Sequence, residues 1–276
     1  MMDEAALHGH IEKLRAESGA NAIGVHFHDY ESERTFAHDS DRWFHAASTM
    51  KVAILIALFH AANSGRVRLD DRLHVRNRFR SIVDRSIYRV HRDRDADAAV
   101  HRRIGRSMKL IELAEPMITR SSNLATNLLL DFLTPDYVQS TLSSAGVTGV
   151  KVVRGVEDTV AFDRGLNNTL TAAGLVELFR LLREDRLLPE PARRQAFEIL
   201  SAQEFNSMIP SLLPDSAQVA HKTGEISTCT HDAGLVLLPG RRPYALAILT
   251  EHPPGLDDTQ KTVARVSRLV FEFITA

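Results

Sequence analysis

The feature that most constrains the fold is the position of the strand-like segments, which occur only near the two ends of the chain. They cover residues 21–28, 34–38, 217–220, 233–238 and 244–250. Between the two groups, from residue 48 to about residue 200, the signals are almost all helical. The two ends are therefore expected to share one antiparallel sheet, with a helical domain inserted between them.

Helical patterns also occur at both ends of the chain. Apolar residues recur at helical spacing before Gly19, and again along one face of residues 263–273. We expect an α/β (α+β) fold, in which an antiparallel five-stranded sheet is flanked by N- and C-terminal helices. The sheet domain would take residues 1–47 plus 205–276, and the all-helical domain residues 48–204.

The composition is typical of an ordinary globular protein. Of the 276 residues, 44% are hydrophobic and 25% charged, and the net charge of −1 gives no reason to expect nucleic-acid or membrane binding. The single Cys229 excludes an internal disulfide and is more typical of a buried residue than of a nucleophile. No stretch approaches the roughly 18 apolar residues of a membrane span. Because the chain starts without a secretory pattern, we expect it to be cytoplasmic as written, or exported if a leader has been removed.

A serine and a lysine lie three residues apart at the start of an apolar helical run. Ser48 and Lys51 precede residues 52–59, which contain no helix breaker. At this spacing the two side chains share one helix face. A partly desolvated lysine has a lowered pKa and can accept the serine proton, which makes the hydroxyl a nucleophile. Taken alone, the pair also fits a helix N-cap followed by a surface lysine.

Two further segments contain chemically useful groups. Ser121, Ser122 and Asn123 lie where a turn leads into a second apolar helix, so that a hydroxyl and an amide are able to face one cleft. Lys222-Thr223-Gly224 ends the alternating stretch 217–220, and its glycine allows a substrate backbone to approach closely.

In their order and spacing, the three motifs resemble those of the class A β-lactamases and the wider penicillin-recognising serine hydrolases, with Ser122 in place of the usual aspartate. The resemblance covers nearly the whole chain. It implies a β-lactamase/transpeptidase-like fold with the active site between the sheet and the helical domain.

The resemblance also implies roles in acylation. Ser48 would attack the substrate carbonyl, and Lys51 would act as the base. Ser121 would relay the proton to the departing nitrogen. Asn123 would hold both Lys51 and a substrate amide carbonyl.

Substrate binding is implied at the third motif. Lys222 and Thr223, with Gly224 beside them, would bind the substrate carboxylate. The backbone N–H groups of Ser48 and Glu225 would form the oxyanion hole. Glu225 itself departs from the small residue usual at that position and would place negative charge near the mouth of the site.

Deacylation is the step for which the resemblance is weakest. Class A β-lactamases carry Glu-x-x-Leu-Asn on an Ω-type loop, where the glutamate activates water. In this chain Glu157 follows Arg154 at nearly the family distance, but no Leu-Asn follows it at the family spacing, and the loop is expected to close on Asn168. Glu157 is therefore either the deacylating base or a surface carboxylate.

Two other patterns are expected to carry no chemistry of their own. Eleven arginines between residues 72 and 106 fit a solvated surface better than a basic rim over the cleft. His26 and His28 share one face of a strand, but no third ligand has a suitable spacing, so no metal is expected. No cofactor is expected.

We therefore predict a serine hydrolase that acts through a covalent acyl-enzyme, with β-lactam hydrolysis as the leading activity. The alternatives are a related esterase, amidase or D-alanyl carboxypeptidase-like hydrolase, and a lactam-binding sensor that deacylates slowly. The expected partner is a small β-lactam or related amide or ester, bound by a monomer.

Overall fold

The computed structural model describes residues 3–276, which form two compact units. The first unit contains Met1–Thr49, Thr169–Arg180 and Phe205–Ala276, and the second contains Met50–Asn168 and Leu181–Glu204. Residues 169–180, expected in the helical domain, thus lie in the first unit. Helix α8 (Ala172–Arg183) begins in the first unit and ends in the second.

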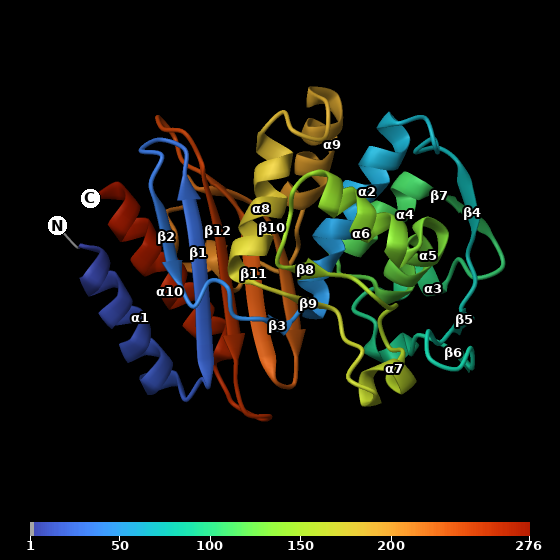
Figure 1. Ribbon diagram of the computed structural model, residues 1–276, viewed down its shortest axis with the longest axis horizontal. Coiled ribbons are helices and arrows are strands. Elements are labelled where there is room, and N and C mark those ends of the chain that lie inside the picture. The colour runs from blue at the N-terminus through green and yellow to red at the C-terminus, as the bar shows by residue number, and fades with distance from the viewer. Residues whose placement is uncertain (1–2) are drawn as a thin grey trace. The chain divides into compact units, whose positions relative to one another are not determined.

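The first unit is built on a five-stranded antiparallel sheet with the order β10-β11-β12-β1-β2. In Figure 1 the blue N-terminal strands lie beside the orange and red C-terminal ones. The strands are β1 (Ala22–Asp29), β2 (Thr35–His38), β10 (Gln218–Ile226), β11 (Cys229–Leu237) and β12 (Tyr244–Glu251). Outside this sheet, β3 (Phe44–His45) pairs antiparallel with β9 (Thr169–Leu170). The expected five-stranded sheet formed from both chain ends is confirmed.

Helices α1 (Glu4–Ser18) and α10 (Thr259–Thr275) cover one face of this sheet. Asp3 caps α1 by accepting the Ala6 N–H at 2.8 Å, and Gly19 ends it in the left-handed region at φ +72°. The shared core comprises, among others, Leu7, Ile11, Leu14, Val25, Phe27, Val263, Val266, Val270 and Phe273. Both terminal helices are therefore where the apolar periodicity predicts them.

The second unit is organised around α2 (Lys51–Asn63), whose first nine side chains are all buried. Such a helix, apolar on every side, is stable only when other elements surround it. The helices of this unit with ten or more residues, besides α2, are α4 (Leu110–Thr119), α5 (Asn123–Leu133), α6 (Pro135–Ser144) and α9 (Glu190–Ser201). The short helix α7 (Thr159–Asp163) lies on the loop after β8 (Val150–Lys151).

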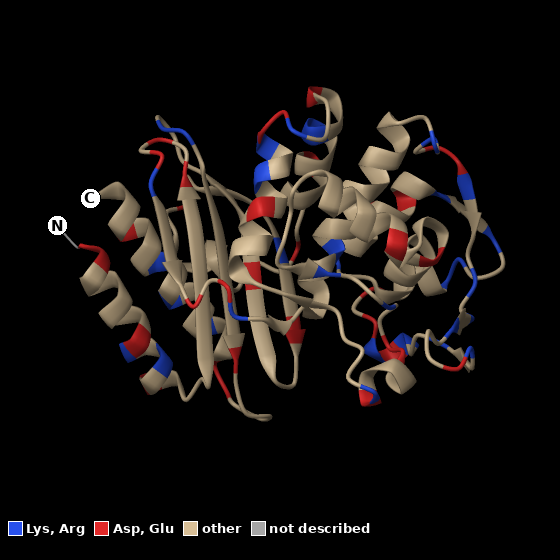
Figure 2. Cartoon of the chain, viewed as in Figure 1, with Lys and Arg blue, Asp and Glu red and all other residues tan. Residues whose placement is uncertain are grey.

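We expected the segment between α2 and α4 to be almost all helical, but most of it is not. It contains the short strands β4 (Arg72–His74), β5 (Phe79–Arg80), β6 (Ile87–Tyr88) and β7 (Ser107–Lys109), and two short helical turns, η2 (Arg92–Arg94) and α3 (Ala98–His101). Strand β4 pairs with β7 across more than thirty intervening residues, so no local pattern marks it. All eleven arginines of residues 72–106 are exposed, interspersed with acidic side chains (Figure 2). This arrangement fits the solvated surface that we expected.

Within residues 3–276, no helix combines the length and the apolar character that crossing a bilayer requires.

Candidate active site

Ser48 lies in a tight helical turn, η1 (Ala47–Met50), which continues directly into α2. Its side chain is half-buried. Ala47 adopts a left-handed conformation at φ +43°, and its N–H donates to His45 Nδ1 at 3.0 Å. Because left-handed backbone is strained for a residue with a Cβ, His45 stabilises the conformation that presents Ser48.

A second histidine holds His45 in place. His231 on β11 is fully buried, and its Nε2 donates to the His45 carbonyl at 2.8 Å. Its Nδ1 accepts the Thr250 N–H at 3.1 Å, so the ring is the neutral Nε2–H tautomer. Burial lowers the pKa of His231 to about 4, which keeps it neutral at physiological pH. Neither histidine belongs to a motif, and sequence analysis did not single them out.

Lys222 is fully buried in β10 and donates to the Thr223 carbonyl at 2.8 Å. Burial lowers the pKa of Lys222 to about 7, although the carboxylate of Asp232 acts in the opposite direction. The ammonium is therefore only partly populated near neutral pH, and a bound anion would favour it.

Gly224 lies directly against the turn that carries Ser48. A Cβ at Gly224 would lie 2.9 Å from the Ser48 backbone nitrogen and 3.0 Å from that of Thr49. Such distances are shorter than real Cβ contacts, so only glycine fits here. This close approach brings the third motif and the nucleophile together within the first unit.

The Glu225 carboxylate is held by the first turn of α10. Its Oε2 accepts a hydrogen bond from Gln260 Nε2 at 2.8 Å, and the side chain is exposed. The Glu225 carboxylate, which departs from the family pattern, is thus held by a hydrogen bond from Gln260.

Lys51, Ser121 and Asn123 form one cluster in the second unit. Nζ of Lys51 donates to the Ser121 carbonyl at 2.7 Å, to Ser121 Oγ at 3.0 Å and to Asn123 Oδ1 at 2.9 Å. Lys51 is fully buried at the start of α2, and Ser121 is left-handed at φ +58°. The first and second motifs, which the sequence separates by 70 residues, are therefore in direct contact.

Glu157 extends this cluster. Asn123 Nδ2 donates to Glu157 Oε1 at 3.2 Å, and the His91 N–H donates to Oε2 at 2.9 Å. Asn123 therefore connects Lys51 to Glu157. Since a carboxylate oxygen is able to accept two hydrogen bonds, each Glu157 oxygen retains capacity for a water molecule.

The loop that carries Glu157 is closed by two asparagines. Asn168 Oδ1 accepts the N–H groups of Val153 and Arg154 at 2.8 and 3.1 Å, and its Nδ2 donates to the Arg154 carbonyl at 2.9 Å. The Arg154 guanidinium donates to Asn167 Oδ1 at 2.7 Å. Asn168 thus closes the loop through the backbone, whereas the side-chain partner of Arg154 is Asn167.

Asn127 of α5 fixes the loop just before the glutamate. It is buried, accepts the Val156 N–H at 2.7 Å and donates to the Val156 carbonyl at 2.9 Å. No motif marks this residue, which the sequence analysis missed.

No metal site is evident in the part of the chain that the structure describes, because no three suitable His, Cys, Asp or Glu side chains come together in residues 3–276. Burial raises the pKa of the Cys229 thiol to about 12, so it is not a reactive thiolate.

The model of the beta-lactamase enzyme family matches residues 6–274. A β-lactamase of Streptomyces fradiae is 26% identical and is aligned over 98% of this chain and 87% of its own. A β-lactamase of Nocardia asteroides is 28% identical over 94% of this chain and 81% of its own.

Solved structures agree with these relatives. The class A β-lactamase of Mycobacterium abscessus superposes with a TM-score of 0.85 at 25% identity, covering 98% of this chain and 100% of the other. A mutant of PBP-A, solved as an acyl-enzyme complex with penicillin G, gives a TM-score of 0.84 at 26% identity over 98% and 97% of the two chains.

The fold and the serine–lysine pair define a serine hydrolase of the penicillin-recognising type, as the three motifs predicted. The chain belongs to the beta-lactamase enzyme family.

Proposed function

We propose that the chain hydrolyses the amide bond of β-lactams through an acyl-enzyme on Ser48. The observation that carries this proposal is the Lys51 cluster, in which one buried lysine contacts both the hydroxyl of Ser121 and the amide of Asn123. A lysine in this position is able to pass a proton from one hydroxyl to another.

In acylation, Oγ of Ser48 forms a bond to the lactam carbonyl carbon while neutral Lys51 accepts the hydroxyl proton. The ring C–N bond then breaks, and Ser121 Oγ delivers a proton to the departing nitrogen. Ser121 regains its proton from Lys51, whose Nζ lies 3.0 Å away. Lys51 is then neutral again.

The first unit would bind the substrate at two places, its carboxylate and its reacting carbonyl. Lys222 and Thr223 would pair with the carboxylate that β-lactams carry beside the ring nitrogen. The N–H groups of Ser48 and Glu225 would stabilise the oxyanion, each contributing about 3–4 kcal/mol to the transition state. The tight fit of Gly224 against Ser48 supports this arrangement.

In deacylation, Glu157 would take a proton from the water that attacks the acyl carbon. Its contact with Asn123 supports this role over that of a carboxylate facing only solvent. Breaking the ester returns the proton to Ser48 and completes the hydrolysis.

A second candidate is a lactam-binding protein that acylates and releases product slowly. The likeness to PBP-A favours it, as does the absence of Leu-Asn at the family spacing after Glu157. Both candidates are expected to form a Ser48 adduct, but the lifetime of this adduct differs between them.

Intact-mass measurement after mixing with benzylpenicillin tests both candidates. A β-lactamase shows an adduct that decays within seconds while penicilloate accumulates. A slow binder shows one stable adduct for each chain. Absence of any adduct and of any hydrolysis, across a panel of penicillins and cephalosporins, would overturn the proposal.

A further inference from the structure

A buried carboxylate from a distant part of the chain contacts the second motif. Asp95 lies in the arginine-rich segment of residues 72–106, and its side chain is 0% exposed. Its Oδ1 accepts the Asn123 N–H at 2.9 Å, and its Oδ2 accepts the Leu124 N–H at 2.9 Å. The Ser122 hydroxyl lies 3.4 Å from the same Oδ2.

These contacts satisfy the N-terminus of α5, where backbone N–H groups have no partner within the helix. Ser122 is the cap residue, and its hydroxyl accepts the Ala125 N–H at 3.3 Å. The two preceding N–H groups, of Asn123 and Leu124, go to Asp95. A negative charge at this end of a helix is also favoured by the helix dipole.

Asp95 is itself held by His101. Nε2 of His101 lies 3.0 Å from Asp95 Oδ2, and both side chains are buried. The imidazole thus supplies a donor, and in its protonated form a positive charge, to a carboxylate that would otherwise be costly to bury.

We propose that Asp95 is the positioning residue of the Ser121–Asn123 turn, replacing from a distance the aspartate that this chain lacks at Ser122. The inference rests on the proposed role of that turn in acylation. Ser121 is left-handed at φ +58°, a conformation that persists only where its surroundings enforce it. The Pro116 carbonyl accepts the Ser122 N–H at 2.9 Å on one side, and Asp95 binds the N–H groups that follow.

Without the Asp95 carboxylate, the turn would lose the contacts that aim Ser121 Oγ and Asn123 Oδ1 at Lys51. A displacement of about 1 Å in catalytic groups lowers rates by on the order of 10²-fold. Substrate binding at Lys222 and Thr223 does not depend on these contacts. The loss should therefore fall mainly on kcat and on the acylation rate, and a rise in KM should come only from the substrate contact proposed for Asn123.

Asp95→Asn tests this directly, because the amide keeps the shape but turns an NH2 group toward one of the two N–H donors. The expected result is a fall in kcat of about 10²-fold with a folded protein. Asp97→Asn is the matched control. Asp97 is also buried and caps a helical turn, α3, through the Ala99 N–H at 2.8 Å.

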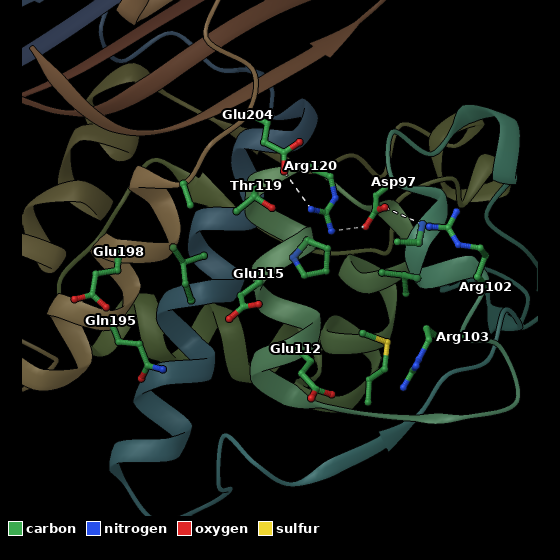
Figure 3. A pocket seen from close by; sticks show the side chains of 16 residues that line it. Asp97, Arg102, Arg103, Glu112, Glu115, Thr119, Arg120, Gln195, Glu198 and Glu204 are labelled. Carbon is green, nitrogen blue, oxygen red and sulfur yellow. Dashed lines mark hydrogen bonds and ion pairs between the residues drawn. The ribbon is translucent and has the colours of Figure 1, made fainter.

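The Asp97 side chain contacts Arg120 rather than the polar side chains of the Ser121–Asn123 turn. Figure 3 shows Arg120 between Asp97 and Glu204, at the wall of a separate cavity of about 870 Å³. Asp97→Asn should therefore lower the melting temperature of the protein but leave kcat unchanged. Equal losses of kcat in the two variants would overturn the proposal, since Asp95 would then act only on general stability.

A charge swap gives a second, independent readout. Ser122→Asp restores the residue usual in the family but places a second carboxylate beside that of Asp95, whose Oδ2 lies 3.4 Å from the Ser122 hydroxyl, so it should lower activity. Adding Asp95→Asn to Ser122→Asp should then raise kcat at least tenfold above the Ser122→Asp single variant. Failure of this rescue, with both proteins folded, contradicts the proposal.

The positioning role and the proposed function are separable. If the parent protein hydrolyses no lactam, the proposed function fails, and the same variants are then compared by the rate at which a fluorophosphonate labels Ser48. Slower labelling in Asp95→Asn than in Asp97→Asn supports the positioning role, and equal labelling overturns it.

Discussion

Nζ of Lys51 lies 3.0 Å from Oγ of Ser121, and the same nitrogen contacts the Ser121 carbonyl at 2.7 Å. The lysine that follows the nucleophile on one helix is thus bonded to the hydroxyl expected to protonate the leaving group. A base and an acid that share one hydrogen bond exchange a proton without solvent, which is what acyl transfer to a serine requires.

Ser48→Ala should abolish both hydrolysis and covalent labelling by penicillin, because it removes the proposed nucleophile, whereas the neighbouring Thr49 is buried and its hydroxyl donates to the Ala46 carbonyl at 2.6 Å. Intact-mass spectrometry measures the adduct. Ser140→Ala, on the exposed face of α6, is the control and should label as the parent does. Labelling that persists in Ser48→Ala would show that another residue is the nucleophile.

The activity toward carboxylate-bearing lactams should fall as the pH rises above about 7. In the free protein the pKa of Lys222 is lowered to about 7 by burial, so the ammonium that binds the carboxylate is present below this pH and lost above it. The pH profile of kcat/KM reports this free-enzyme value. A neutral ester substrate should lack the decline, and Lys222→Ala should remove it. An identical decline for both substrates would assign the titration to another group.

Glu157→Gln should acylate at nearly the parent rate and then accumulate acyl-enzyme. Removing a well-placed general base costs on the order of 10²–10⁴ in rate, so the adduct should be visible by rapid-quench mass spectrometry. If the variant turns over as the parent does, a different group activates the water, and the slow-binder or esterase interpretation gains support.

Gly224→Ala should lower kcat/KM on the order of 10²-fold, because a Cβ would lie 2.9 Å from the Ser48 nitrogen and displace the turn. Gly9→Ala is the control, since a Cβ there meets nothing within 4 Å. Steady-state kinetics measure both variants. Full activity in Gly224→Ala would mean that the contact with Ser48 is dispensable.

Asn127→Ala should destabilise the protein by about 1–3 kcal/mol, because the N–H and carbonyl of Val156 each lose a buried partner. It should also slow deacylation more than acylation, since Val156 precedes Glu157. Urea denaturation and the adduct lifetime measure the two effects. Gln139→Ala is the control, because Gln139 makes a similar pair of hydrogen bonds to Val150 and Val152, before the loop. The same change in adduct lifetime in both variants would contradict a local effect on Glu157.

The parts of the fold that periodicity encodes were predictable. The apolar spacing before Gly19 and along residues 263–273 predicted both terminal helices, and the alternating segments at the two ends predicted the sheet. The expectation that the segment between α2 and α4 is almost all helical was wrong. The strands there are two or three residues long, which is too short for a periodic signal, and β4 pairs with a distant partner, as Arg72 does with Lys109.

By itself, the sequence determined which chemical groups this protein has and which elements carry them, because a helix face, a cap or a motif depends on residues only a few positions apart. The tertiary structure decided which distant groups meet. His231 supports the turn before Ser48 from 186 positions away, and Asp95 binds the N-terminus of α5 from 28. Such contacts leave no trace in local spacing, since they depend on the path of the whole chain and on the need of each buried polar group for a partner.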